Sequence, residues 1–142
     1  MPEPRLCAEV DIDVPFFDVD SMHIVWHGNY VKYFEIGRCA LLRLIGYDYP
    51  EMAAGGYLWP IVDCRLRYVR PARYGQRIRV KASLLEWENR LRIAYEIRDC
   101  ESGERLTRGE TVQVAVEAAS QAMQFVSPPD LVERVRAKCG NC

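Results

Sequence analysis

The strongest constraint on the fold is a regular alternation of apolar and polar side chains in the second half of the chain. A period of two residues is typical of β-strands that have one buried face and one solvent-exposed face. The alternation predicts strands over residues 62–68, 78–84, 91–97 and 112–116. The connections at residues 87–89 and 99–103 are short enough for hairpins, so we expect the strands to form an antiparallel sheet.

Further elements are expected on both sides of this region. Residues 8–14 also alternate and supply a first strand, and a last strand is expected through Met123 and Phe125. The two prolines within residues 127–130 break the sheet. After them we expect a short C-terminal helix at about residues 130–138.

One long helix is predicted over residues 29–45, which contain no proline. Asn29 is the expected N-cap and Gly46 the expected end, which gives about four turns. Arg38 is expected to lie off the apolar face of this helix. That face is formed by Tyr30, Tyr33, Phe34, Gly37, Leu41, Leu44 and Ile45.

A sheet with one apolar face needs a cover, and the predicted helix is the sizeable apolar element available for it. We therefore expect the α+β class, with a curved antiparallel sheet wrapped around one long central helix. The 142 residues suit a single domain, residues 1–142, with its core at about residues 7–126. Hydrophobic residues make up 49% and charged residues 27% of the chain, a globular composition that argues against disorder.

Charge and hydropathy exclude several classes of partner. The formal net charge is −1, which favours neither nucleic acid nor an anionic membrane. The first residues lack the apolar run of a signal peptide, and residues 53–62, the most apolar stretch, are too short to span a bilayer.

We expect a cytoplasmic enzyme or binding module whose six cysteines are reduced thiols. Cys139 and Cys142 have the spacing of a metal or redox pair, but no second pair completes a zinc site, and we expect a frayed tail.

The segment between the first strand and the helix, residues 17–30, follows neither period. It combines apolar side chains with two carboxylates, Asp18 and Asp20, and with both histidines of the chain, His23 and His27. We expect the segment to be largely buried because it leads into a buried helix, and its carboxylates then need hydrogen-bond donors. No metal is expected at the histidines, since their spacing of four suits a helix and the helix starts after them.

This segment resembles the signature of the 4-hydroxybenzoyl-CoA thioesterase and YbgC-like family of acyl-CoA thioesterases, which have the hot-dog fold. The resemblance covers about residues 10–116 and includes a second, less specific motif, the loop at residues 68–75. His23 stands where the family usually has Gly. The residues that match the first motif are Asp18, Asp20, Ile24, Val25, Trp26, His27, Gly28, Asn29 and Tyr30.

The resemblance implies that Asp20 is the catalytic carboxylate. In such enzymes this carboxylate either attacks the thioester or activates water, and both routes stay open here. A carboxylate suffices because a thiol, with a pKa near ~8.5, leaves readily. The purely structural alternative is that Asp20 accepts backbone hydrogen bonds in a turn. Asp18 is expected to order the loop.

The resemblance gives His27 the second catalytic position. Its backbone amide matches the family's donor to the thioester oxygen, at a helix start where amides lack intrahelical acceptors. The His27 imidazole either holds the acyl group or a water molecule, or it is a buried structural histidine.

The resemblance also suggests contacts with the substrate. Core packing explains the aromatic residues among them equally well, and solvent exposure on the helix explains Glu35. The residues expected around the acyl group are Trp26, Asn29, Tyr30 and Glu35. Arg70 and Arg73 are expected near the CoA phosphates because their loop borders the site in similar proteins. The remaining strand arginines are expected to form a basic, solvated sheet face.

The leading function is an acyl thioesterase that acts on acyl-CoA or acyl carrier protein thioesters without a cofactor. A homodimer or homotetramer is expected, since similar proteins pair their sheets edge to edge and build their sites between subunits. One alternative is a hot-dog 3-hydroxyacyl thioester dehydratase, although its signature is not seen here. The other is a non-catalytic acyl-binding or scaffold module, which His23 at the usual Gly position keeps open.

Overall fold

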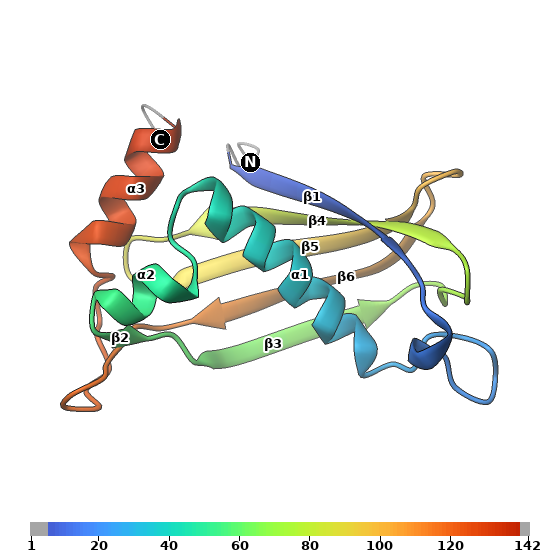
Figure 1. The fold of residues 1–142 in the computed structure, drawn as a ribbon, viewed down its shortest axis with the longest axis horizontal. Coiled ribbons are helices and arrows are strands. Elements are labelled where there is room, and N and C mark those ends of the chain that lie inside the picture. The colour runs from blue at the N-terminus through green and yellow to red at the C-terminus, as the bar shows by residue number, and fades with distance from the viewer. Residues whose placement is uncertain (1–5, 140–142) are drawn as a thin grey trace.

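The computed structural model describes residues 6–139 (Figure 1). Along the chain, an N-terminal strand is followed by helices and then by the strands of the sheet. The elements are β1 (Cys7–Asp13), η1 (Phe16–Asp18), α1 (Asn29–Leu44), α2 (Tyr49–Ala54), β2 (Tyr57–Leu58), β3 (Ile61–Tyr68), β4 (Arg77–Glu86), β5 (Leu91–Asp99), β6 (Arg105–Gln113), β7 (Val116–Glu117) and α3 (Pro129–Cys139).

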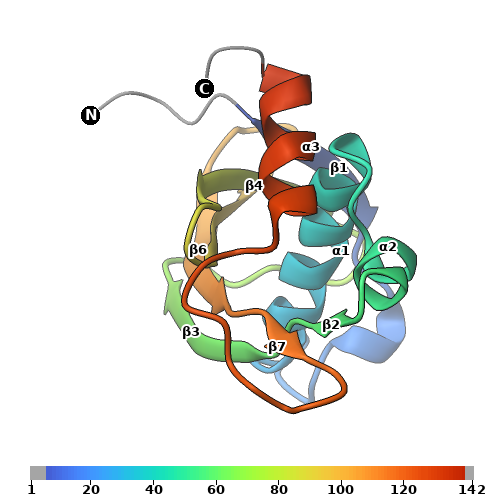
Figure 2. The same ribbon diagram turned by 90° about the vertical axis from the view of Figure 1, so that its left-hand side faces the viewer.

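A five-stranded antiparallel sheet in the order β1-β4-β5-β6-β3 forms the body of the molecule. The sheet curves around α1, which lies across one of its faces, and α2 packs beyond α1 (Figures 1 and 2). The inward side chains of β4 and β5 are buried beneath α1, as their alternation predicts. The expected α+β class, with one long helix inside a curved sheet, is confirmed.

Two glycines allow α1 to approach the sheet closely. A Cβ atom at Gly37 would lie 2.9 Å from Cγ1 of Val80, so a larger residue there would push the helix away from β4. On β6, a Cβ atom at Gly109 would lie 2.5 Å from the ring of Phe34. Phe34 uses this space to stack on Tyr95, with 4.5 Å between ring centroids.

The helix begins and ends near the expected residues, but two details were wrong. Asn29 is the first residue of α1 rather than its N-cap, and no side chain caps the helix at Gly28. Gly46 follows the helix with a φ of 71°, a conformation that favours glycine. Arg38, expected off the apolar face, is buried because Glu35 and the hydroxyl of Tyr49 accept hydrogen bonds from its guanidinium group.

The strand expected at residues 112–116 starts earlier, since β6 begins at Arg105. Its inward positions are occupied by polar or very small residues, which hide the apolar alternation. These residues are Thr107, Gly109, Thr111 and Gln113. No strand forms through Met123 and Phe125, because Met123 makes a single bridge to Val116 and Phe125 is exposed.

The edge strand β3 lacks the buried face that its alternation predicted. Val62 and Tyr68 on that face are 55% and 49% exposed. Because β3 is the last strand of the sheet, no further strand of the described chain pairs with its outer edge. The edge therefore offers unpaired backbone groups together with apolar side chains.

The C-terminal helix, expected at about residues 130–138, spans Pro129–Cys139. Its apolar residues Leu131 and Val135 are buried, and Arg134 hydrogen-bonds the carbonyl of Gly46 at the end of α1. The predicted tail pair lies outside the described residues at Cys142. Among residues 6–139, no helix has the length and hydrophobicity to cross a bilayer.

Candidate active site

The loop between β1 and α1 folds back on itself and lies against the 68–75 loop. The amide of Asp20 donates a 2.9 Å hydrogen bond to the carbonyl of Ile24, and Val19 bridges Val25. Ile24 in turn bridges Arg73 of the second loop. The two motifs of the sequence, separated by the whole of α1, therefore meet at one place in the fold.

This loop is not largely buried, contrary to expectation. Phe17, Met22 and Trp26 are 82%, 67% and 50% exposed. The segment packs through a few side chains, such as Val25, and through the backbone, while its remaining apolar groups face outward. Exposed apolar side chains in this number are typical of a surface that another molecule covers.

Asp18 holds the loop to the helix. Its buried carboxylate accepts a 2.7 Å hydrogen bond from the hydroxyl of Tyr33 and a second hydrogen bond from the ammonium group of Lys32. Its carbonyl accepts hydrogen bonds from the side-chain amide of Asn29 and the backbone amide of Trp26. Burial, reinforced by the Asp18 carboxylate, raises the pKa of Tyr33 far above its usual range. Asp18 therefore has the hydrogen-bond donors that we expected for a buried carboxylate.

Asp20 lies at the turn of the loop and is only half-buried. Oδ1 of its carboxylate accepts a 2.8 Å hydrogen bond from the amide of Met22, which is an Asx-type turn contact. Within the described part of the chain, Oδ2 has no hydrogen-bond donor. One carboxylate oxygen thus positions the turn while the other stays available.

His23 adopts a φ of 65°, in the left-handed region that glycine favours. This conformation explains why a glycine suits this position of the motif. The His23 side chain is exposed. It therefore does not fill the space beneath the loop.

The indole of Trp26 occupies the space in which a side chain at Gly28 would begin. A Cβ atom at residue 28 would lie 2.2 Å from Cζ3 of the Trp26 indole, closer than any contact permits. The indole also approaches the imidazole of His27, with 5.0 Å between the ring centroids. Trp26, His27 and Gly28 are therefore closely packed where the loop enters α1.

The start of α1 presents backbone amides without acceptors. Among residues 6–139, no carbonyl or side chain accepts a hydrogen bond from the amides of His27 and Gly28. These amides carry the positive end of the helix dipole. The carbonyl of His27 is fixed by a 2.8 Å hydrogen bond from the hydroxyl of Tyr68 on β3.

A groove of about 230 Å³ opens beside these amides. It is mainly apolar and is lined by Ile24, Val25, His27, Tyr30, Tyr68, Val69, Arg70 and Pro71. Tyr30 is buried, and its hydroxyl accepts a 3.0 Å hydrogen bond from the amide of Ala72. Burial raises the pKa of Tyr30, and the nearby charges of Tyr68 and Asp20 add to the increase.

The other predicted site residues are spread around this groove. Trp26 is exposed and does not line the groove, and the side-chain amide of Asn29 donates to the carbonyl of Asp18. Glu35 does not line the groove, because it lies more than one turn further along α1 and forms a 3.1 Å ion pair with Arg38.

The two loop arginines also differ in position. Arg70 lines the groove and forms a 2.8 Å ion pair with Glu104. Arg73 is exposed, and its backbone amide donates to the side chain of Gln76.

Two contacts of the site were missed by the sequence reasoning. Tyr68 was assigned to a buried strand face, and nothing near it in the sequence links it to His27. Lys32 is not part of the predicted apolar face of the helix and was not named as a site residue, yet it pairs with Asp18. A helical-wheel search for donors one turn beyond Asn29 would have found Tyr33 and Lys32 as partners for a carboxylate at the helix start.

Residues 14–137 match the family described as the thioesterase-like superfamily. The chain is 31% identical over 134 residues to "Putative esterase sll0410" of Synechocystis sp., which covers 89% of this chain and 77% of that protein. It is 39% identical over 69 residues to "Putative acyl-CoA thioesterase YneP" of Bacillus subtilis. That match covers 49% of this chain and 50% of the Bacillus relative, so the chain spans only half the length of that protein.

Among solved structures, a DHNA-CoA thioesterase from Staphylococcus aureus is similar, with a TM-score of 0.77 and 25% sequence identity. The likeness covers 84% of this chain and 80% of that chain. The chain belongs to the thioesterase-like superfamily and has the hot-dog fold. The expected resemblance is thereby confirmed, and acyl-CoA thioesterase activity is supported at the level of the family.

Proposed function

We propose that this protein hydrolyses acyl thioesters, carried by CoA or by acyl carrier protein, at the groove beside the start of α1. The observation that carries the proposal is that one short loop holds both a carboxylate with a free oxygen, Asp20, and the acceptor-free amides of His27 and Gly28, although Asp20 itself does not line the groove. Thioester hydrolysis needs both parts: a base or nucleophile, and donors for the oxyanion that forms on the carbonyl oxygen.

In the proposed reaction, the thioester oxygen accepts hydrogen bonds from the helix-start amides, each worth about 3 kcal/mol in the transition state. Asp20 then acts by one of two balanced routes. Its free oxygen either attacks the carbonyl carbon, giving a mixed anhydride that water later opens, or removes a proton from water that attacks directly. In both routes the C–S bond breaks and the thiolate leaves with the bonding electrons.

The remaining site residues have supporting roles in this proposal. Trp26 and Tyr30 border the acyl group, the His27 imidazole contacts it or a water molecule, and Asn29 acts by holding the loop. Glu35, one helical turn or more away, reaches the acyl group where a longer chain extends along α1. We assign contacts with the CoA phosphates to Arg70, which lines the groove, and to Arg73, which is exposed on the same loop.

We also propose that the active form is a homodimer or homotetramer. The loop and β3 both carry exposed apolar residues, and the β3 edge has no partner strand among the described residues. Pairing of two β3 edges would bury both features. We further propose that the protein resides in the cytoplasm, a reducing compartment in which its free thiols at Cys7, Cys39, Cys64 and Cys100 would persist.

The test is release of free thiol from a series of acyl-CoA esters by the wild-type protein and by Asp20→Asn. Asparagine keeps the Oδ1 acceptor for the amide of Met22, so the turn is preserved while the charge is lost. We expect the rate to fall about 10²–10⁴-fold. Asp130→Asn, a surface carboxylate on α3 that pairs with Arg134, is the matched control and should leave the rate unchanged.

Other outcomes identify the alternatives. Unchanged hydrolysis in Asp20→Asn would overturn the role of Asp20. Formation of an enoyl product from a 3-hydroxyacyl thioester would indicate the dehydratase. Tight acyl-CoA binding without thiol release would indicate a binding or scaffold module.

A further inference from the structure

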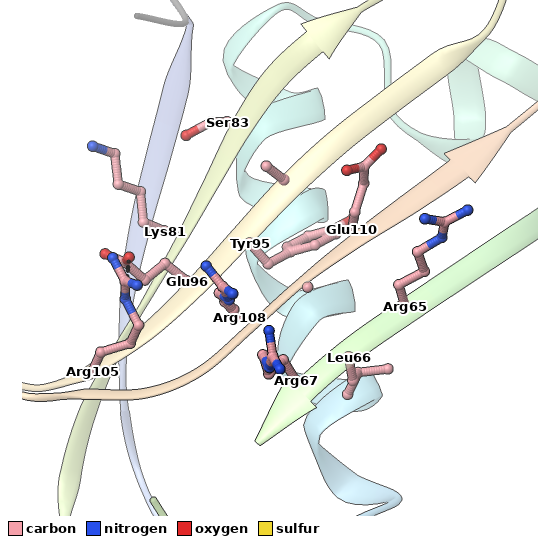
Figure 3. A pocket seen from close by; sticks show the side chains of 12 residues that line it. Arg65, Leu66, Arg67, Lys81, Ser83, Tyr95, Glu96, Arg105, Arg108 and Glu110 are labelled. Atoms are coloured by element: carbon pink, nitrogen blue, oxygen red, sulfur yellow. Dashed lines mark ion pairs between the residues drawn. The ribbon is translucent and has the colours of Figure 1, made fainter. Parts of the chain in front are cut away.

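The face of the sheet that is turned away from α1 carries a second concavity, of about 650 Å³ (Figure 3). This volume lies within the range of small-molecule sites. Side chains from β3, β4, β5 and β6 line it, and α1 lies behind the sheet in this view. The sheet itself therefore separates this concavity from the groove at the start of α1.

The concavity contains a pair of like charges that the fold brings together. Arg67 on β3 and Arg108 on β6 are direct cross-strand partners. Their Cβ atoms are therefore about 5 Å apart, an arrangement that destabilises a sheet when the charges are alike. No carboxylate within residues 6–139 forms an ion pair with either arginine.

This pair is unusual because other arginines on the same face form ion pairs with carboxylates. Arg79 lies opposite Asp11 and forms a 2.8 Å ion pair with it. Arg92 is paired with Glu110 across the sheet. An uncompensated pair of guanidinium groups, held in register by a sheet, is a site that an anion would stabilise.

Lys81 extends the positive charge across the concavity. Glu96 lies between Arg108 and Lys81 in the cross-strand row, but Arg98 and Arg105 already bind its carboxylate. Although partial burial opposes the change, these two arginines hold the pKa of Glu96 below its usual value. In the described chain Lys81 has no ion pair.

The shape of the concavity agrees with a small ligand. Ser83 and Ala94, which are adjacent cross-strand partners, are small residues that line it and leave room between the longer side chains around them. The Ser83 hydroxyl adds a hydrogen-bond donor.

We propose that this concavity binds the diphosphate group of a nucleotide. Arg67 and Arg108 together hold one phosphate, and Lys81 with Ser83 holds the other. Guanidinium groups suit phosphate oxygens because their paired N–H donors match two oxygens at once. The ligand is either a free nucleotide or the adenosine diphosphate portion of CoA, and the site does not depend on hydrolysis at the α1 groove.

The test is calorimetric titration of the full chain with ADP and with inorganic pyrophosphate at constant ionic strength. The double variant Arg67→Gln with Arg108→Gln removes the proposed phosphate contacts. We expect its affinity to fall at least about tenfold, the equivalent of one lost charged hydrogen bond. The matched control, Arg90→Gln with Arg136→Gln, removes the same charge outside the concavity and should bind like the wild type.

Thermal melting tests whether the double variant is folded. Without ligand it should melt at the same temperature as the wild type or higher, because a like-charge pair is removed. Pyrophosphate should raise the melting temperature of the wild type and of the control, but not that of the double variant. Absence of binding to the wild type, or equal binding to the double variant, would overturn the proposal.

A kinetic comparison identifies the source of the diphosphate. If the double variant raises KM for acyl-CoA but not for an acyl-N-acetylcysteamine thioester, which has no phosphates, the ligand is CoA. If it changes neither KM while nucleotide binding is lost, the ligand is a separate nucleotide. Both results support the site, and hydrolysis of the truncated thioester tests the proposed function independently.

Discussion

The hydroxyl of Tyr33 donates a 2.7 Å hydrogen bond to the buried carboxylate of Asp18 and so joins the loop that precedes α1 to the second turn of that helix. Tyr33→Phe leaves this buried carboxylate with one donor fewer. We expect a loss of about 1–3 kcal/mol in the free energy of unfolding, measured by urea denaturation. Tyr74→Phe, an exposed tyrosine without such a bond, is the control, and equal stability of the two variants would contradict the role of Tyr33.

Gly28→Ala should destabilise the protein because the new methyl group overlaps the indole of Trp26. The expected cost is about 1–3 kcal/mol. In the background of Trp26→Ala, the same substitution should cost much less, since the colliding ring is absent. A double-mutant cycle by denaturation measures this coupling, and strictly additive effects would refute the close contact.

His23→Gly should stabilise the protein, because φ of 65° is costly for any residue with a Cβ atom. The expected gain is up to about 1 kcal/mol, reduced by the greater entropy of glycine in the unfolded chain. His23→Ala keeps the Cβ atom and is expected to give no such gain. Thermal melting of the three proteins measures the difference, and a gain in His23→Ala equal to that in His23→Gly would point away from backbone strain.

Asp99 should contribute to the loss of stability in acid. Hydrogen bonds from the amide of Ser102 and the side chain of Gln76 lower its pKa below the ordinary value of 3.8. A lowered folded-state pKa gives stability that is present above pH 3.8 and is lost as the pH falls through the folded value. Asp99→Asn should therefore flatten the decline of the melting temperature between neutral pH and pH 3, whereas an unchanged decline would exclude this contribution.

Val62→Lys should separate the subunits of the proposed dimer. The side chain is 55% exposed on the β3 edge strand, so lysine is tolerated in the isolated chain but charges a paired edge. Sedimentation velocity should show a smaller species than the wild type, with reduced hydrolysis. Leu85→Lys, on β4 away from that edge, controls for the change in charge. A wild-type protein that is itself monomeric would contradict the proposed assembly.

The central strands and the long helix could be predicted from sequence because each buries one regular face. Strand β6 was predicted only at its end, since Thr107 and Thr111 occupy buried inward positions where the pattern requires apolar residues. Arg38 was misplaced for a related reason. Its burial depends on Glu35 and on Tyr49, whose element, α2, the sequence pattern did not indicate.

The candidate site could be predicted from a contiguous motif, but a contiguous motif cannot reveal contacts with residues that are distant in the sequence. The roles proposed for Asp18 and for the helix-start amides follow from residues that are close in the chain. The hydrogen bond from Tyr68 to the carbonyl of His27 joins residues 41 positions apart, and only the folded sheet brings them together. Likewise, Arg67 and Arg108 are unremarkable in sequence and become a like-charge pair through strand register.

That long-range hydrogen bond has a mechanical consequence. Tyr68 ends the edge strand, and its hydroxyl donates to the carbonyl of the same peptide unit whose N–H is the acceptor-free amide of Gly28. A displacement of the strand by another chain is thus transmitted to the direction in which that amide points. If the protein assembles at this edge as we propose, pairing of the edge strands also orients the proposed oxyanion donors, so dilution below the dissociation constant of the assembly should reduce hydrolysis before the protein unfolds.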